Sequence, residues 1–357
     1  MSKQRIYVDI HALQILPPSC VNRDDTGAPK TCIYGGTSRA RVSSQSWKRA
    51  IRSEFPELLP DEDLGLRTKK IVEMVKEEII KLDPSIPEDK AVKTAEAALT
   101  NAGLKIKNAQ VGTDALLLMS KKQASSLAEL AVKGEKDKKL FKQALASNPS
   151  VDMALFGRMV AADPSLNFDA ACQVSHAIST HETATEFDYF TAVDDLANED
   201  TAGAGHIGIT EFNSSTLYRY ATINVMELYR SLGLAASEAV EAFVKAFITS
   251  MPTGKMNSFA NRTTPSSVYI AIRVDQPVSF AGAFEKAIPA SANGYLEPSQ
   301  KKMTEFAKKL TSTFVKEPYK AFAIGDGMEA LADSEPMDEV LEKLQQEIRT
   351  LLENGEQ

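Results

Sequence analysis

The sequence predicts an α+β fold built on a ferredoxin-like, or RRM-like, sheet that carries long insertions. Apolar residues alternate with polar ones, the period of a strand, in residues 5–13, 216–225 and 267–275. Helical spacing of apolar residues follows Ser43 and returns over 236–250. Strand, helix, then strand, helix, strand is the order of a ferredoxin-like sheet. That fold serves many functions, so the function must be argued from its side chains.

A polar region lies in the sequence between the first strand and the helix that follows Ser43. A long polar loop is expected from Pro17 to Gly36. The alternation in "RARV" then places Arg39 and Arg41 on one face of a short strand. Ser43 or the following serine is a good N-cap. The helix that it starts is amphipathic, with Lys48 and Arg52 on its polar side.

The middle of the chain reads as an inserted helical region. Residues 67–148 show helical spacing, broken at Pro84 and Pro87. "SVDMALFGRMVAA" (150–162) returns to an apolar core pattern, and "DAACQVSHAISTH" (169–181) is either a helix or a strand. Residues 194–214 contain three glycines and few apolar residues, which predicts an exposed hairpin or loop. A final amphipathic helix is expected from Met337 to about Leu352.

Composition indicates a globular protein of a reducing compartment. The chain has 357 residues, 43% hydrophobic and 25% charged, enough for a sizeable core. It shows no signal peptide and no apolar run long enough to span a membrane, so we expect a cytoplasmic location. The three cysteines, Cys20, Cys32 and Cys172, are odd in number and widely spaced, which argues against a disulfide framework.

The charge is segregated along the chain. The net charge is -7, yet residues 30–52 contain six basic residues and no acid, whereas residues 326–357 contain ten acids and two basic residues. A helix N-terminus with a basic face favours an anion. Arg39 and Arg41 would flank this site, and Ser43 and Gln45 would add neutral donors. A basic helix face is also common as plain solvated surface, but the lack of acids favours an anionic ligand.

The sequence lacks the common catalytic signatures: it has no phosphate-binding loop, no nucleophile elbow and no H-E-x-x-H. Cys172 and His176 could share a helix face as metal ligands, but further ligands at suitable spacing are missing. The acids that follow His181 are more simply a solvated stretch. We therefore expect no metal site and no cofactor.

Asp24 and Asp25 are the best candidates for metal-assisted cleavage of a phosphodiester. Carboxylates in a loop can position Mg²⁺ against a scissile phosphate, and Arg23 precedes the pair. Adjacent carboxylates in loops are also common as turn formers and as partners of a nearby arginine. Both interpretations remain open at this point.

A set of ordered motifs resembles the CasC (Cse4) family, the guide-RNA-binding backbone subunit of the type I-E CRISPR complex called Cascade. These motifs are "PSCVNRDD", "YGGTSRARVSSQSWKRAIR", "ALFGRM", "HAISTH", "FDYFTAVDDL" and "GHIGITEF". The resemblance is close over the first 50 residues and over 150–225, and looser to about residue 300.

The resemblance implies a hand-shaped protein. Its palm is RRM-like and discontinuous, over 1–58 and 216–357; the mainly helical fingers take 59–185, and the thumb hairpin takes 186–215. Copies of such a subunit polymerise along the guide RNA, and each thumb displaces a base of the neighbouring segment.

The family match also implies RNA contacts, which fall on these residues of the chain: Arg23, Ser43, Gln45, Lys48, Arg52, Met159, Phe190, Thr191 and Lys255. Apolar side chains such as Met159 and Phe190 can break base stacking. Without the family match, core packing is the simpler interpretation of both.

The sequence therefore predicts a non-catalytic RNA-binding assembly subunit. Its expected partners are crRNA, target DNA through the crRNA, copies of itself and other Cascade subunits, with no membrane. The acidic C-terminal helix is expected to face away from the RNA. Two alternatives stay open: a backbone subunit that cuts RNA with Mg²⁺ through Asp24 or Asp25, and a ferredoxin-like scaffold that binds only protein.

Overall fold

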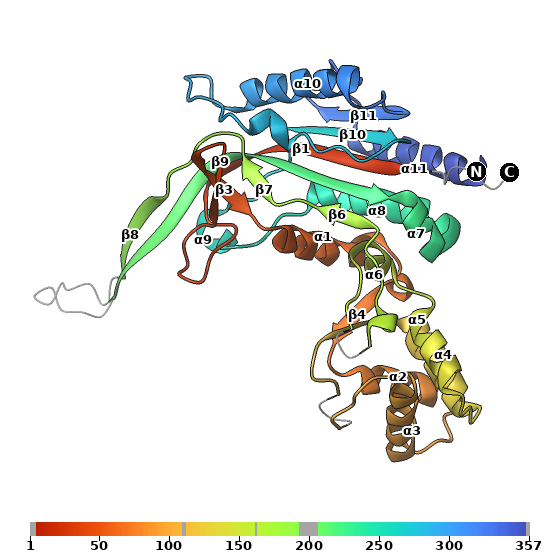
Figure 1. Ribbon diagram of the computed structural model, residues 1–357. Helices are drawn as coiled ribbons and strands as arrows, with labels where there is room; N and C mark the ends of the chain where they lie inside the picture. The colour runs from red at the N-terminus through yellow and green to blue at the C-terminus, as the bar shows by residue number, and fades with distance from the viewer. Residues whose placement is uncertain (1–4, 109–111, 161–162, 193–205, 355–357) are drawn as a thin grey trace, which may run out of the picture.

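An antiparallel sheet forms the centre of the computed structural model, which describes residues 5–108, 112–160, 163–192 and 206–354 (Figure 1). Its strand order is β11-β10-β1-β9-β7-β3-β2, and β6 and β8 also pair with β9. The strands are β1 (Tyr7–Ser19), β2 (Thr31–Tyr34), β3 (Thr37–Val42), β6 (Cys172–Val174), β7 (Ala177–Ser179), β8 (Glu186–Ala192), β9 (His206–Asn224), β10 (Ser267–Arg273) and β11 (Lys320–Gly325).

The core of this sheet has ferredoxin-like topology. In chain order it runs β1, helix α1 (Ser44–Leu58), β6 with β7, β9, helix α8 (Ala236–Thr249) and β10. In space β10 pairs with β1, β1 with β9, and β9 with β6 and β7. This is the spatial order 4-1-3-2 of a split β-α-β fold. The predicted fold class is confirmed. Segment 169–181 forms two short strands, β6 and β7, and not a helix.

The two faces of the sheet bury different cores. Ile10 and Ile270 pack with α1, α8 and the last helix, α11 (Met337–Asn354). Leu13 and Tyr218 point to the other face, which residues 278–288 and helix α10 (Leu296–Thr313) cover. β1 runs to Ser19 rather than ending before Pro17, and the expected 17–36 loop contains β2.

A second core lies in the helical insertion between α1 and β6. Its apolar side chains come mainly from four helices, α2 (Ile71–Leu82), α3 (Glu88–Asn101), α4 (Lys121–Val132) and α5 (Lys138–Ala146). The two-stranded antiparallel sheet of β4 (Gly65–Thr68) and β5 (Leu117–Ser120) and helix α6 (Val151–Phe156) connect this insertion to the sheet. The remaining helices are α7 (Val225–Leu232) and α9 (Met256–Phe259), with single 3-10 turns at Asp61–Asp63, Pro164–Leu166, Gly233–Ala235 and Ala281–Phe284.

A two-stranded hairpin projects from the sheet, at the left of Figure 1. β8 pairs with the first part of β9, from Glu186 opposite Phe212 to Ala192 opposite His206. The second part of β9 pairs with β1 in the centre of the sheet. Residues 193–205, where part of the exposed hairpin or loop was expected, lie outside the described residues.

Buried polar side chains fasten the segment after β10 to the sheet. Asp9 accepts hydrogen bonds from the Tyr220 hydroxyl (3.0 Å) and from the Val278 backbone N–H (2.8 Å). The Tyr218 hydroxyl lies 2.9 Å from His11 Nδ1 and accepts from the Phe280 N–H at 2.8 Å. Burial raises the pKa of Asp9 to about 6 and lowers that of His11 to about 3. Burial therefore favours the neutral form of each of these two side chains.

Within the described residues, every helix is too short or too polar to cross a membrane. The three cysteines are free thiols; Cys20 and Cys172 are buried.

Candidate nucleic-acid interface

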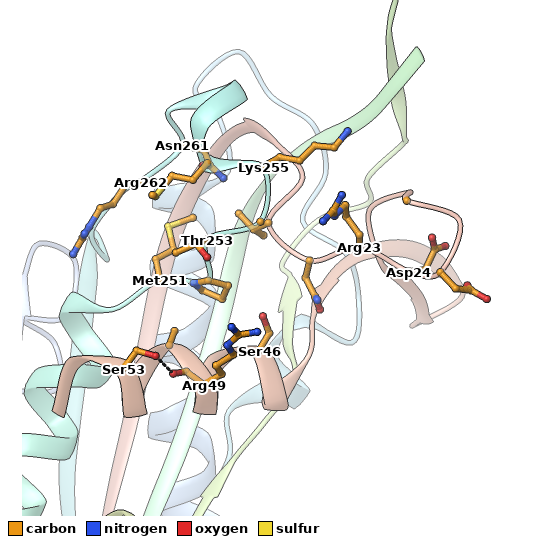
Figure 2. A pocket seen from close by; sticks show the side chains of 18 of the residues that line it. Arg23, Asp24, Ser46, Arg49, Ser53, Met251, Thr253, Lys255, Asn261 and Arg262 are labelled. Carbon is orange, nitrogen blue, oxygen red and sulfur yellow. Dashed lines mark hydrogen bonds between the residues drawn. The ribbon is translucent and has the colours of Figure 1, made fainter. Parts of the chain in front are cut away.

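An open cavity of about 780 Å³ lies beside the N-terminal half of α1. We call it the α1 cavity. Its walls are one flank of α1, the loop 22–27, and the segment 251–262 that follows α8 (Figure 2). Three pieces of chain that are remote in sequence therefore form one hollow on the surface.

Four cationic side chains line the α1 cavity: Arg23 from the loop, Arg49 from α1, and Lys255 and Arg262 from segment 251–262. Three acidic side chains, Asp24, Asp25 and Glu54, line it as well, so the cations exceed the acids by one. Arg23, Arg49 and Arg262 are solvent-exposed. Arg262 forms an ion pair with Glu54 at 3.8 Å; both side chains are partly exposed, and such a pair contributes little to stability. The cationic groups are thus available to a polyanion.

The loop 22–27 is held by its own side chains. The Asn22 Oδ1 accepts the Ser43 N–H at 2.8 Å, which ties the loop to the start of α1. Asp24 Oδ1 accepts from the Thr26 hydroxyl (2.7 Å), the Thr26 N–H (2.9 Å) and the Ala28 N–H (3.0 Å). The Thr26 side-chain hydrogen bond lowers the pKa of Asp24. Asp24 therefore acts as a turn former, the simpler of the two interpretations.

The segment 251–262 is positioned by close contact with the end of β1 and with the hairpin. A Cβ added to Gly254 would lie 2.3 Å from the Val21 carbonyl oxygen, so only glycine fits. Lys255 Nζ donates to Thr210 Oγ1 at 3.2 Å. The rings of Phe212 and Phe259 lie 5.9 Å apart. The α1 cavity is thereby fixed next to the base of the β8–β9 hairpin.

Helix α1 has two polar flanks on either side of its buried stripe of Trp47, Ile51 and Phe55. Ser46, Arg49 and Ser53 are on the cavity flank. Lys48 and Arg52, which the sequence analysis placed at the RNA, are on the other flank, toward α6. Lys48 Nζ lies 5.9 Å from the centre of the Phe156 ring.

Arg52 makes a structural ion pair. Its Nε donates to Asp152 Oδ2 at 2.6 Å, and its Nη2 donates to the Gly65 carbonyl at 3.0 Å. The side chains of Arg52 and Asp152 are 28% and 2% exposed. Asp152 also accepts from the Gly65 N–H (2.9 Å) and the Ser150 hydroxyl (2.6 Å). Arg52 thus joins α1 to the start of the helical insertion.

The structure corrects the expectation for Arg39. This side chain is 0% exposed, and its guanidinium donates to the carbonyls of Ser179 (2.9 Å), Phe284 (3.0 Å) and Glu285 (3.2 Å). The face of β3 that carries Arg39 is covered by the segment after β10, so Arg39 cannot reach a bound strand. Arg41, on the same face, stays at the surface and bonds to the Thr31 carbonyl (3.2 Å).

Ser43 and Gln45 open α1, outside the cavity lining. Ser43 is the N-cap, as expected, and its hydroxyl accepts the Ser46 N–H at 3.3 Å. Ser43 is 7% exposed, so its hydroxyl serves the helix first. Gln45 is exposed in the first turn.

Met159 is 82% exposed, so the core-packing interpretation is wrong for this residue. The reason lies in its neighbours. Gly157 ends α6 with φ 79°, and the buried guanidinium of Arg158 donates to the carbonyls of Leu145 (3.0 Å) and Leu166 (2.8 Å). Arg158 anchors the chain inward and leaves Met159 on the surface.

Phe190 and Thr191 lie on the projecting hairpin. Phe190 is 42% exposed and pairs with Gly208 across the hairpin. A Cβ on Gly208 would lie 2.3 Å from Phe190 Cζ, so the ring lies directly over the glycine. Thr191 is exposed opposite Ile207. Of the predicted RNA contacts, then, Arg23 and Lys255 line the α1 cavity, and the others lie outside its lining.

The model of the CT1975-like protein family (Cas_CT1975) matches residues 8–351. The chain belongs to this family. Among solved structures it is similar to a chain titled "CRISPR RNA-guided surveillance complex, pre-nicking", with 33% identity, a TM-score of 0.78, and coverage of 95% of this chain and 100% of that chain. A second, titled "CRISPR RNA-guided surveillance complex", has 31% identity and a TM-score of 0.62, covering 94% of this chain and 99% of that chain. No curated protein matches.

The sequence analysis missed Arg49, Arg262 and Asn261 in this CT1975-like protein. Arg49 is one of the six basic residues of 30–52, and the spacing of Trp47 and Ile51 indicates that it is exposed, but not which flank of the helix lines a cavity. Arg262 and Asn261 follow a helix more than 200 residues later, and only the fold brings them to α1. No signal in the sequence alone would have selected them.

We next consider the residues that could have bound a metal ion, in the part of the chain that the structure describes. No group of three or more His, Cys, Asp or Glu side chains there is arranged to hold a metal ion. Cys172 is in a strand rather than on a helix with His176, and burial raises its thiol pKa to about 12.

Proposed function

We propose that this chain is the RNA-binding backbone subunit of a CRISPR effector complex, of the CasC (Cse4) type found in type I-E Cascade. Copies of it line up along a crRNA, hold its phosphates irrespective of base sequence, and present the bases for pairing with target DNA. Other Cascade subunits complete the complex. The family match and the titles of the two similar structures support this assignment.

The observation that carries the proposal is the convergence of Arg23, Arg49, Lys255 and Arg262 on one open cavity. These residues come from three separate segments. Contacts of cationic side chains to phosphates hold a strand without reading its bases. Such contacts suit a subunit that must accept any guide sequence.

The hairpin supports the assembly of copies. Phe187, Tyr189 and Ile209 lie on one face of it and are 68%, 62% and 66% exposed. A two-stranded ribbon has no second layer of its own to cover such a face, and large exposed apolar patches mark interaction sites. We assign this face to a neighbouring copy and its RNA. The division into palm (1–58 and 216–357), fingers (59–185) and thumb (186–215) is part of the proposal.

The first experiment asks what copurifies with the protein. Purified together with its neighbouring subunits, it should carry small RNA of one defined length. A preparation free of RNA, or carrying RNA of random length, would contradict the proposal and favour the protein-only scaffold.

A salt titration then tests the α1 cavity. For single strands, log K falls with log salt by ~0.7 per neutralised phosphate. Arg23→Ala with Arg49→Ala should weaken RNA binding and reduce that slope by ~1.4. Lys301→Ala with Lys302→Ala, two exposed lysines on α10, is the matched control and should leave the slope unchanged. Equal slopes in all three proteins would refute the site.

The cutting alternative has a direct assay. We propose no catalytic role, no metal and no cofactor; in support, Asp24 Oδ1 accepts three hydrogen bonds within its own turn. RNA incubated with the complex should remain intact with and without Mg²⁺. Cleavage by the parent that Asp25→Ala abolishes would establish the alternative instead.

Two further parts of the proposal concern the cellular compartment and the position of α11 relative to the RNA. The free thiols suit the reducing cytoplasm. The acidic helix α11 faces away from the RNA: it packs on α8, and Figure 1 shows it at the end of the sheet remote from the hairpin.

A further inference from the structure

One buried polar group in the α1 cavity lacks a partner. Asn261 is 1% exposed and lines the cavity. Its Nδ2 has no hydrogen-bond acceptor in the structure. Among the buried side-chain nitrogen and oxygen atoms without partners in the described residues, it is the one whose residue lines this cavity. Native proteins rarely leave such donors unpaired, because the unmade hydrogen bond costs stability.

The backbone around Asn261 is also held in an uncommon conformation. Ala260, directly before it, has φ 48° and ψ 42°, and Lys255 has φ 45°, both left-handed. Residues with a Cβ avoid this region of the φ/ψ map unless the surrounding structure imposes it. The two left-handed residues bracket α9, so the turn that carries Asn261 into the cavity wall is defined by the fold.

The position of Asn261 complements the cations. Figure 2 shows Asn261 on the wall formed by segment 251–262, between Lys255 and Arg262 and across the cavity from Arg49. The arginines are exposed, whereas Asn261 is buried. A strand drawn in by the cations would bring hydrogen-bond acceptors, its phosphate oxygens and ribose hydroxyls, to a donor that has none.

We propose that Asn261 is a specific RNA contact in which its amide Nδ2 donates a hydrogen bond to an acceptor oxygen of the sugar-phosphate chain. The inference rests on the proposed function and adds to it a neutral, buried recognition group among the cations. Free protein carries the unpaired donor, and the bound strand satisfies it.

Asn261→Leu tests this, because it removes the amide at nearly constant volume. RNA affinity of the complex subunit should fall ~10-fold, while stability to urea should stay equal or rise, since an unpaired buried donor has been removed. A residue with only a structural role would show the opposite pattern. Asn257→Leu, on an exposed amide of α9 outside the cavity lining, is the control and should change neither quantity. If the leucine variant folds poorly, Asn261→Ala gives the comparison of RNA affinity alone, because the volume that it removes lowers stability by itself.

The probes separate the two kinds of acceptor. If the acceptor is a phosphate oxygen, Asn261→Leu weakens binding of single-stranded RNA and of DNA of the same sequence by equal factors. If it is the ribose 2′-hydroxyl, only RNA binding falls. The inference is overturned if Asn261→Leu binds both as the parent does while the Arg23→Ala, Arg49→Ala protein loses binding. Retained binding in that double variant would instead refute the α1 cavity as the RNA site, and a preparation free of RNA would contradict the proposed function.

Discussion

Replacing Arg52 by alanine separates its two possible roles. As an RNA contact, Arg52 would leave stability nearly unchanged when removed, within ~0.5 kcal/mol, and its loss would reduce the salt slope of RNA binding by ~0.7. As the partner of Asp152, it would leave a carboxylate that is 2% exposed without its counter-charge. The two roles therefore predict different measurements.

The magnitude follows from the surroundings of the carboxylate. Removing one partner of a buried ion pair costs ~3–5 kcal/mol. Here the Gly65 N–H and the Ser150 hydroxyl still donate to Asp152, and the Arg52 side chain is 28% exposed, so water can enter the space that it leaves. We therefore expect Arg52→Ala to lower the free energy of unfolding by ~2–3 kcal/mol.

Urea unfolding followed by tryptophan fluorescence measures this change, because the chain has one tryptophan. That residue, Trp47, is buried in α1, the helix that carries Arg52. Arg49→Ala, on the cavity flank of the same helix, is the control: it should keep parental stability and bind RNA more weakly. An Arg52→Ala protein as stable as the parent, with a reduced salt slope, would falsify the ion-pair reasoning.

Three further predictions address other parts of the molecule. Burial raises the pKa of Asp9 from 3.8 to about 6, so the folded state holds the proton more tightly than the unfolded state. As the pH rises from 4 to 6, the parent should therefore lose stability, by ~3 kcal/mol at most. Asp9→Asn should show a flatter pH profile in urea unfolding. Arg39→Met leaves three carbonyls without their donor and should cost ~3 kcal/mol or more, with unchanged RNA affinity of the folded protein. Gly208→Ala should push the Phe190 ring off β9; a fluorescent base analogue in the bound RNA should then lose the signal of its displaced base, and an unchanged signal would argue against that role for the ring.

The fold class and most elements of the sheet could be read from the sequence because their patterns are local. The alternation of Ile270 and Ile272 and the spacing of Phe243 and Phe247 correspond to β10 and α8. The N-cap at Ser43 follows from chemistry within three residues. The extension of β1 could not be predicted, because Pro17 and Pro18 suggest a loop and only pairing with β9 keeps the strand extended.

The candidate site was less accessible from the sequence, because its residues depend on long-range packing. The periodicity of β3 correctly puts Arg39 and Arg41 on one face, but the segment after β10 covers Arg39 and leaves Arg41 at the surface. Likewise a helical wheel separates Lys48 from Arg49 without showing which flank meets the insertion and which meets the cavity. Charge patterning predicted that α1 binds an anion, and tertiary contacts decide which side chains are available.

The continuity of β9 has a mechanical consequence. Its 19 residues belong both to the sheet centre and to the projecting hairpin, so no joint separates the two. The 7 residues of β8, at ~3.3 Å each, give the paired part of the hairpin a length of ~23 Å. Because every copy has the same hairpin, its paired part would extend the same distance from the sheet in each copy of a row. In the proposed assembly, the spacing between successive copies would then depend on the number of residues in β8.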